Sequence, residues 1–192
     1  MATVQDLVRR NRSYRRFDNS FTLNDAALHQ LVDLGRLSPN GGNMQPLRFA
    51  VSSGAKNAAI YACLGWAGYL PKWPGPIEAE RPTGYIIILC DSALSKTPAE
   101  DAGIAAQSIM LGAVEMGLGG CIFKNINHGK LKEALALPDN LDIAMVLAIG
   151  KPVECVVMDD VGTDGDIKYW REDNGVHHVP KRALADVLVS IE

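Results

Sequence analysis

The sequence of 192 residues lacks long apolar runs, and this shortage excludes two classes of protein. The charge-free run from Ala102 to Val114 has 13 residues, whereas a helix that spans a bilayer needs about 20. The N-terminus reaches Arg9 and Arg10 without the apolar stretch of a secretory signal peptide. We therefore expect neither a membrane-spanning protein nor a secreted one.

Positive charge and cysteine are also in short supply. Lysine and arginine number 19 against 22 acidic residues, which gives a net charge of −3 and a pI near 5.8. A protein of this balance has no general attraction for nucleic acid or anionic lipid, so we expect neither as a partner. The four cysteines lie 27, 31 and 34 residues apart without a CxxC pair. They are typical of reduced core thiols in a cytoplasmic protein rather than of disulfides or a zinc site.

Apolar periodicity and turn residues predict helices and strands along the whole chain, without an internal repeat or a linker between domains. Helices are predicted after Thr3, after Asn24 or Asp25, over 55–69, from Pro98 to Met116, from Asn127 to Leu137 and from Pro180 onward. Strands are predicted over 47–51, 85–90, 121–123 and 143–149, and an irregular segment over 161–175. Because helices and strands mix without strict alternation, we expect one α+β or α/β domain over residues 1–192.

Two of these elements are informative about burial. The run 85–90 is continuously apolar, which indicates a strand at the centre of a single sheet. The 98–116 helix carries apolar and small residues around most of its circumference. Such a helix must be buried, and we expect part of that burial to be against a second subunit.

The densest chemical signal is a group of five arginines within the eight residues from Arg9 to Arg16. Guanidinium groups match phosphate oxygens in pairs, and Ser13 adds a hydroxyl, so the segment suits a small phosphorylated ligand. A solvated basic helix end is the alternative interpretation. A nucleic-acid site is disfavoured because only Tyr14 and Phe17 supply aromatic rings there.

Two further segments could contact such a ligand. In the stretch from Ser38 to Pro46, amide side chains stand on a glycine-rich turn and could bond the edge of a heterocycle. In the stretch from Gly117 to Asn125, bare backbone at a helix end could approach a flat ligand. Each segment alone is equally typical of an ordinary turn. The glycines at 117–120 do not form a dinucleotide fingerprint, because Ile122 occupies the place of the last glycine.

In their order and spacing, these segments resemble the FMN-dependent nitroreductase family. Residues 12–17 are similar to its opening phosphate motif, 38–46 to its PS-x-x-N-x-Q-P loop, and 117–121 to its GLG-x-C turn. Residues 148–152 resemble its hydrophobic-G-x-P strand end, and 181–182 resemble the basic pair that opens its last helix. The resemblance covers nearly the whole chain. It implies an α+β fold with a mostly antiparallel central sheet flanked by helices.

The resemblance also implies a homodimer with two FMN sites at the subunit interface, each built from both chains. The phosphate and the pyrimidine edge of the flavin would be held by Arg12, Ser13 and Arg15, together with Lys181 or Arg182. The partner's loop would supply Ser38, Pro39, Asn43 and Gln45. The backbone would pass the flavin ring near its N5 atom along Ile122, Phe123, Lys124 and Asn125.

The aromatic residues around the proline-rich stretch 70–84 are the candidates for substrate contact. In this family the matching region often lines the substrate channel, which would place there Trp66, Tyr69 and Trp73. Ordinary packing under a loop is the alternative. His177 and His178 do not suggest a metal site, because neighbouring strand residues point to opposite faces.

The implied activity is two-electron reduction of nitroaromatics, quinones or similar acceptors by NAD(P)H, with ping-pong kinetics. The flavin would carry the hydride, so no catalytic acid or base side chain is expected, and Arg15 would lie near flavin N1. Departures from the family pattern at Asn11, Leu47 and Lys124 bear on substrate and reduction potential more than on FMN itself.

Three alternatives remain at this stage. A relative with the same fold could catalyse dehalogenation, oxidation or flavin breakdown. The protein could bind flavin without turnover. It could also bind nucleic acid through the basic segment, against which the acidic composition weighs.

Overall fold

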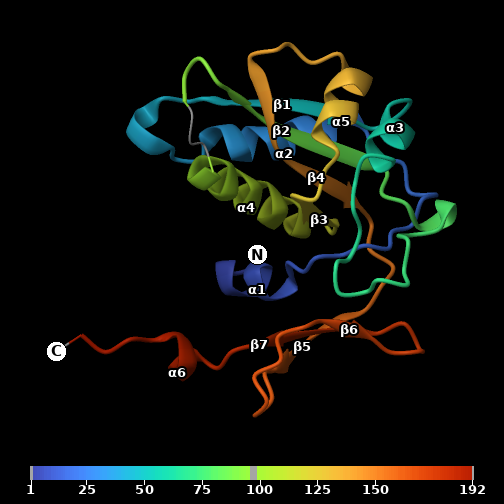
Figure 1. The fold of residues 1–192 in the computed structure, drawn as a ribbon, viewed down its shortest axis with the longest axis vertical. Helices are drawn as coiled ribbons and strands as arrows, with labels where there is room; N and C mark the ends of the chain where they lie inside the picture. Colours follow the sequence, from blue (N-terminus) through green and yellow to red (C-terminus); the bar gives the residue numbers. More distant parts are fainter. Residues whose placement is uncertain (1, 96–98, 192) are drawn as a thin grey trace.

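The centre of the molecule is a four-stranded antiparallel sheet with the strand order β1-β2-β4-β3, as seen in the computed structural model of residues 2–95 and 99–191 (Figure 1). Its strands are β1 (Leu47–Ser52), β2 (Gly84–Asp91), β4 (Leu141–Gly150) and β3 (Gly119–Phe123). Ile87 of β2 lies between Ala50 of β1 and Val146 of β4. The predicted central position of the 85–90 strand is therefore confirmed.

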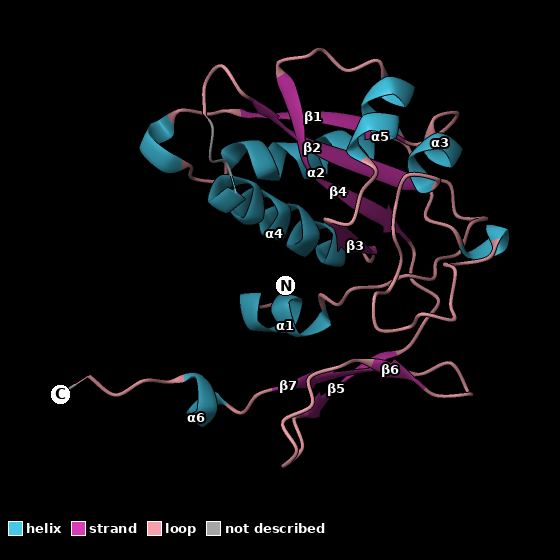
Figure 2. Ribbon diagram, in the orientation of Figure 1, coloured by secondary structure: helices cyan, strands magenta, loops and turns pink. Residues whose placement is uncertain are grey.

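Helices cover both faces of this sheet (Figure 2). On one face Ile86 and Ile88 pack in the cluster that includes residues of α2 (Asp25–Leu37) and α4 (Ala99–Glu115). The alternate residues Ile87 and Leu89 pack on the other face with α3 (Asn57–Tyr61) and α5 (His128–Leu135). This period-2 division explains why the β2 sequence is apolar without a break. The fold is α+β.

Local signals explain where these helices begin. In α1 (Val4–Arg10) the Thr3 and Asp6 side chains form the predicted capping box. Asn24 accepts a hydrogen bond from the Ala27 N–H at 2.9 Å and caps α2. Asn127 accepts from the Lys130 N–H at 3.1 Å and caps α5.

A second sheet of three strands overturns the expectation of a single sheet. β5 (Val156–Asp160) pairs in parallel with β7 (His177–Lys181), and β6 (Trp170–Arg171) pairs with β7 in antiparallel fashion. These strands are short and partly exposed, so their apolar pattern is too weak to predict them from the sequence. Figure 1 shows this C-terminal unit beside α1, with the chain end extended away from the body.

Two predicted helices are wrong in extent. Over 55–69 only α3 is helical, because the chain turns at Gly65, whose N–H donates to the Asn125 carbonyl at 2.9 Å. Pro180 lies in β7 opposite Asp159, and the terminal helix is reduced to α6 (Leu184–Val187). Its apolar stripe has no core to pack on within the chain, since Leu184 is 72% exposed.

The central helix is buried on one side only. Its face toward α2 and the sheet is covered, but Ile104 is 42% exposed and a Cβ added at Gly103 would meet no atom within 4 Å. Pro98, the predicted first residue, lies outside the described residues. The single domain over 1–192 stays a prediction.

Three of the four cysteines are buried as predicted, Cys63, Cys90 and Cys121, while Cys155 is exposed, and all four are free thiols. In the described ranges, no helix has the length and apolar character needed to cross a membrane.

Candidate functional site

The arginine segment runs along the start of β3. After α1 ends, the Tyr14 N–H donates to the Gly120 carbonyl at 2.9 Å, and Phe17 forms a bridge with Pro152. A Cβ at Gly119 would lie 2.6 Å from the Tyr14 ring, so glycine is required for this approach. Three predicted motifs, 12–17, 117–121 and 148–152, therefore meet at one place. Glycine at position 119 makes room for the arginine segment of the same chain, whereas the sequence predicted that these glycines make room for a flat ligand.

The five arginines differ in what neutralises them. Arg16 forms a two-pronged ion pair with Glu80, with Nε–Oε2 2.7 Å and Nη2–Oε1 2.5 Å, and the hydrogen bond lowers the Glu80 pKa. Arg10 donates to the Val114 carbonyl at 3.1 Å. Of the five, Arg16 alone forms an ion pair with a described side chain, and Arg12 and Arg15 differ from the exposed Arg9 and Arg10 in being partly buried. The charges of Arg12 and Arg15 therefore remain available to a ligand.

Arg12 is held in place with one donor left unmatched. Its Nη2 donates to the Val8 carbonyl at 2.7 Å, whereas its buried Nε finds no partner in the described part of the chain. Ser13, the next residue, is exposed. A buried N–H without a partner costs stability unless an acceptor completes it, so this side of the segment suits an anionic ligand.

Behind Arg15 lies a buried polar cluster that the sequence analysis missed. The fully buried Glu154 carboxylate accepts the Arg15 N–H and a 3.0 Å hydrogen bond from Arg171 Nη2. His177 is 0% exposed, and its Nε2 lies 3.3 Å from Arg15 Nη1. The Arg15 guanidinium carbon also lies 4.9 Å from the Tyr169 ring centroid. Backbone, guanidinium and ring contacts together fix Arg15.

The protonation state of His177 follows from this geometry. A guanidinium group can only donate, so Nε2 of His177 accepts and the proton resides on Nδ1. Burial, then the charges of Arg15 and Arg171, lower the His177 pKa to about 4. The only sequence signal for this cluster was a carboxylate just after the Gly-Lys-Pro turn and a pair of histidines, which is too little to predict it.

The predicted backbone contact near flavin N5 falls on the free edge of the central sheet. β3 is an edge strand, and the Gly120 carbonyl points away from β4 to accept from Tyr14. Because strand residues alternate, the Ile122 N–H points to the same free edge. The Phe123 side chain points inward, its ring centroid 4.7 Å from that of Trp66. Only the Phe123 backbone could therefore contact a ligand.

The next two residues along this edge use their side chains elsewhere. Lys124 Nζ donates to the Ala144 carbonyl at 3.1 Å. Asn125 packs against Gly65, where a Cβ would clash with its side-chain amide.

The predicted loop from Ser38 to Pro46 begins beside the middle of α4 and continues toward the end of α4 that is opposite to the arginine segment. The Gly41 N–H donates to Asp101 Oδ1 at 2.8 Å, at the start of α4, whereas Arg10 contacts Val114 near its end. Thirteen helical residues separate Asp101 from Val114, which corresponds to about 20 Å. The part of the loop that carries Asn43 and Gln45 is thus not brought to Arg12 within one chain. Ser38 lies nearer, because its Oγ donates to Ser108 Oγ at 2.7 Å and because Ser38 and Pro39 line a groove together with Leu7 of α1.

The aromatic candidates divide into two groups. Tyr69 and Trp73 line a cavity of about 460 Å³ together with Lys72 and Arg171. The Arg171 guanidinium carbon lies 4.4 Å from the Trp73 ring centroid, and the Tyr69 N–H donates to the Tyr169 hydroxyl at 3.2 Å. Trp66 is absent from the lining and packs against other aromatic rings. Within the chain Trp66 therefore packs under the loop, and its contact with substrate stays a prediction.

The basic pair at 181–182 stands apart from the arginine segment. Lys181 ends β7, and four strand residues separate it from His177, which is a distance of about 13 Å. Neither Lys181 nor Arg182 contacts Arg12 or Arg15 through a hydrogen bond or ion pair in the described chain. Over residues 2–95 and 99–191, no three His, Cys, Asp or Glu side chains group as a metal site would require.

Comparisons with known proteins bear on the family. The description "Nitroreductase family" belongs to a family model that matches residues 8–68 and 82–151. A search of curated proteins found no significant match.

Several solved structures share the fold. An FMN complex of a candidate nitroreductase from Desulfovibrio desulfuricans has a TM-score of 0.72 at 23% identity, covering 100% of this chain and 98% of that one. An FMN-dependent nitroreductase from Clostridium difficile has a TM-score of 0.61 at 21% identity, covering 77% and 86%. A candidate NADH dehydrogenase/NAD(P)H nitroreductase from Bacteroides thetaiotaomicron has a TM-score of 0.64 at 25% identity, covering 80% and 89%. The match over most of the chain, on a fold that these structures share, shows that the chain belongs to the nitroreductase family.

Proposed function

We propose that the protein is an FMN-dependent oxidoreductase that uses NAD(P)H to reduce nitroaromatics, quinones or similar acceptors. The observation that carries the proposal is the pair of unneutralised guanidinium groups, Arg12 and Arg15, beside the free edge of β3. When bound, FMN supplies two-electron hydride transfer between a nicotinamide donor and an acceptor. The neighbours named FMN-dependent nitroreductase and NAD(P)H nitroreductase support both cofactors.

The residues present fit a flavin phosphate. Such a phosphate carries roughly two negative charges and three acceptor oxygens. Arg12 offers its buried, unmatched Nε, and Ser13 offers an exposed hydroxyl on the same segment. Charge-assisted hydrogen bonds of this kind contribute roughly 1.5–3 kcal/mol each. Lys181 or Arg182 remains the proposed additional cation.

Arg15 and the β3 edge fit the ring system. Arg15 keeps its full charge, and His177, Tyr169 and Glu154 restrict its movement. A fixed cation near N1 would favour the reduced, anionic form of the flavin. The Ile122 N–H on the free edge is the candidate donor toward N5.

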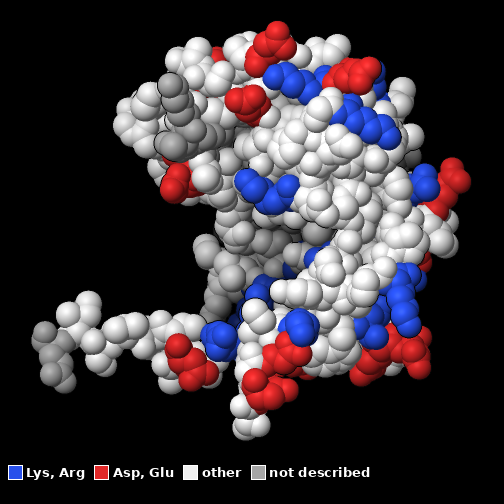
Figure 3. All heavy atoms as spheres, in the orientation of Figure 1, with Lys and Arg blue, Asp and Glu red and all other residues white. Residues whose placement is uncertain are grey.

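A homodimer would complete the site. Gly41, in the loop that carries Asn43 and Gln45, contacts the start of α4, about 20 Å along that helix from the Arg10 contact, so a second copy would have to supply Asn43 and Gln45. Ser38 and Pro39, from the same loop, line the groove beside Leu7 of α1. This groove, of about 420 Å³ between α1, α2 and α4, is lined largely by apolar side chains, which a second copy could cover. Figure 3 shows a broad recess between the central body and the extended C-terminal arm. Such an interface would also cover exposed apolar side chains such as Val4 on α1 and Ile191 in the arm.

The substrate cleft would lie beside the 460 Å³ cavity. Tyr69 and Trp73 offer ring surface there for a flat acceptor, and Lys72 and Arg171 add positive charge at its walls. If the donor leaves before the acceptor enters the same cleft, the kinetics are ping-pong. The cytoplasmic location expected from the sequence stays a prediction.

The experiment that tests the proposal compares two double variants of equal charge. Arg12→Ala with Arg15→Ala should lower FMN affinity by at least a hundredfold, because two charge-assisted contacts are lost. Arg9→Ala with Arg36→Ala removes the same charge from exposed positions and should leave affinity within a fewfold. Flavin retention is read from absorbance after purification, and NADH and NADPH titration under anaerobic conditions then tests reduction.

The outcomes of this experiment separate flavin binding, the phosphate site and turnover. A purified protein that takes up no FMN would contradict the flavin assignment. Stoichiometric flavin in the Arg12/Arg15 variant would contradict the phosphate site. Bound flavin that neither nicotinamide reduces would instead identify a binding module without turnover.

A further inference from the structure

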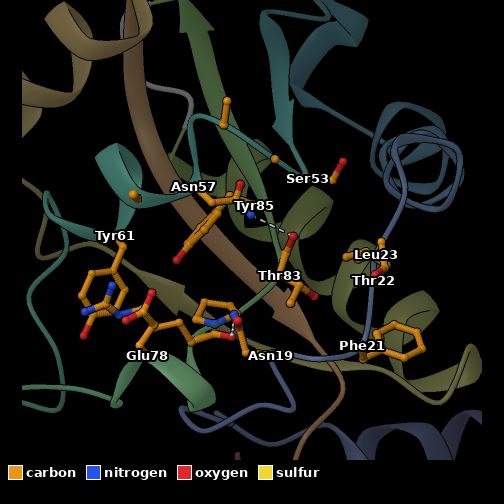
Figure 4. Close-up of a pocket in the computed structure, with 15 residues that line it drawn as sticks. Asn19, Phe21, Thr22, Leu23, Ser53, Asn57, Tyr61, Glu78, Thr83 and Tyr85 are labelled. Atoms are coloured by element: carbon orange, nitrogen blue, oxygen red, sulfur yellow. Dashed lines mark hydrogen bonds between the residues drawn. The ribbon is translucent and has the colours of Figure 1, made fainter.

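A second cavity, of about 350 Å³, lies between the start of β2 and α3 (Figure 4). None of the residues predicted for flavin or substrate lines it. Its volume falls within the range of small-molecule sites, roughly 300–1,000 Å³. The cavity therefore has the size of a separate binding site.

Three polar side chains on one face of the chain form the base of this cavity. Arg81, Thr83 and Tyr85 alternate where the chain enters β2, so their side chains point the same way. Arg81 Nε and Thr83 Oγ1 are buried and have no hydrogen-bond partner in the described chain. Figure 4 shows the Tyr85 ring directed into the space between Tyr61 and Glu78.

The Tyr85 hydroxyl is a third unmatched donor. Tyr85 is 1% exposed, and its hydroxyl bonds to no residue within the described ranges. Burial raises the pKa of Tyr85, so the group remains protonated. Unmatched buried donors cost free energy, and the two buried ones at Arg81 and Thr83, beside the unbonded Tyr85 hydroxyl, indicate that an acceptor is missing.

The neighbouring side chains keep this arrangement in place. Asn57 Nδ2 donates to the Thr83 carbonyl at 2.9 Å, and Ser52 Oγ donates to Asn57 Oδ1 at 2.7 Å. The Tyr61 hydroxyl donates to the Pro76 carbonyl at 3.0 Å. These groups are satisfied, so the cavity is preformed rather than collapsed around Arg81.

Charge decides which ligand suits the site. The Arg81 guanidinium carbon lies 4.2 Å above the Tyr61 ring centroid, and Arg81 forms no ion pair with a described residue. Water could satisfy the hydroxyl groups but would not neutralise a partly buried cation. An anion with at least two acceptor oxygens would do both. The walls add apolar surface from Leu23 and Ala58 and one carboxylate, Glu78, which forms no ion pair with Arg81 in the described chain.

We propose that this cavity binds a small carboxylic acid as its anion, with the carboxylate at Arg81, Thr83 and Tyr85 and an apolar body against the walls. The site is independent of the flavin assignment, because the two share no residue. A planar carboxylate matches a guanidinium group in two-pronged fashion.

The test uses cyclohexanecarboxylate and the full-length protein in isothermal titration calorimetry at pH 7. This probe has no aromatic ring, so it does not stack on a flavin. Its neutral isostere, cyclohexanecarboxamide, should bind at least tenfold more weakly. Tyr85→Phe and Thr83→Val should each weaken carboxylate binding about three- to tenfold, and Arg81→Gln at least tenfold. Arg36→Gln, an exposed arginine on α2, is the control and should change nothing.

The conservative variants keep the test decisive if Arg81→Gln fails to fold. Tyr85→Phe and Thr83→Val each remove only a polar group, so circular dichroism should match the wild type. The absence of a binding signal would overturn the proposal. Equal affinity for the amide, or unchanged affinity in both conservative variants, would overturn it as well, because the probe would then bind elsewhere.

Discussion

At the scale of single residues, the buried group behind Arg15 concentrates more positive charge than negative. Glu154 forms an ion pair with Arg171 and accepts only the backbone N–H of Arg15, while the neutral His177 lies beside the Arg15 guanidinium group. A third charge in this cluster would be poorly solvated and repelled. The neutral imidazole therefore serves as an acceptor that holds Arg15 without competing for its charge.

This arrangement predicts a pH dependence of stability. The His177 pKa is about 4 in the folded protein and about 6.5 in an unfolded chain, so between these values only the unfolded state binds the proton. The contribution of the neutral His177 to the free energy of unfolding is fully present above pH 6.5. It is lost as the pH drops toward 4, by up to about 3 kcal/mol. Urea unfolding between pH 7.5 and 4.5 should show this loss.

His177→Gln keeps an acceptor for Arg15 but does not titrate in this range. Its unfolding free energy should fall less over the same window, and His29→Gln, at an exposed site on α2, should behave like the wild type. If wild type and His177→Gln lose stability in parallel, the imidazole is not held neutral by burial.

At the scale of elements, the contact between the arginine segment and β3 depends on a missing side chain. A Cβ at Gly119 would lie 2.6 Å from the Tyr14 ring and 2.7 Å from Pro152. Gly119→Ala should cost about 1–3 kcal/mol through overpacking, and it should weaken FMN retention by displacing the segment. Urea unfolding and flavin absorbance measure the two effects.

Gly129 provides the matched control. It lies in α5, and a Cβ there would meet nothing within 4 Å. Gly129→Ala should therefore stabilise the protein by about 0.5–1 kcal/mol and leave flavin retention unchanged. A Gly119→Ala protein as stable as the wild type would show that Tyr14 can move aside, contrary to the packing argument.

The elements also show which parts of the fold a sequence can reveal. Strongly apolar β2 and the capping residues Asn24 and Asn127 were predictable, because burial on both faces and side-chain caps leave local patterns. β5 and β7 were not, since they are half-exposed and pair across a long connection. The segment from Leu184 to Ile191 has apolar residues at helical spacing, but it extends away from the body, and only α6 (Leu184–Val187) is helical because no core covers the apolar residues.

The candidate site divides in the same way. Arg12, Ser13 and Arg15 lie in a single segment with an unusual composition, and they were predictable from that composition and from the resemblance. Glu154 and His177 were not predictable, because their roles arise only when distant segments meet in the folded chain.

At the scale of the whole molecule, apolar groups remain uncovered at both ends of the chain. Val4 on α1 is 72% exposed, and Val189 and Ile191 in the arm are 86% and 96% exposed. Figure 1 shows that arm projecting from the body with nothing of its own chain beside it. In the proposed homodimer, a second copy would cover these surfaces and supply its 38–46 loop to the arginine segment.

Mixing two inactive variants tests whether each site is shared between chains. Arg12→Ala with Arg15→Ala damages one half of every site, and Asn43→Ala with Gln45→Ala damages the other half. If one site draws on both chains, a mixed dimer has one site with both halves damaged and one with both halves intact. After unfolding and refolding equal amounts together, half of the dimers are mixed, so about a quarter of all sites should regain FMN. Each variant refolded alone provides the control, and recovery no greater than theirs would mean that a single chain builds its own site.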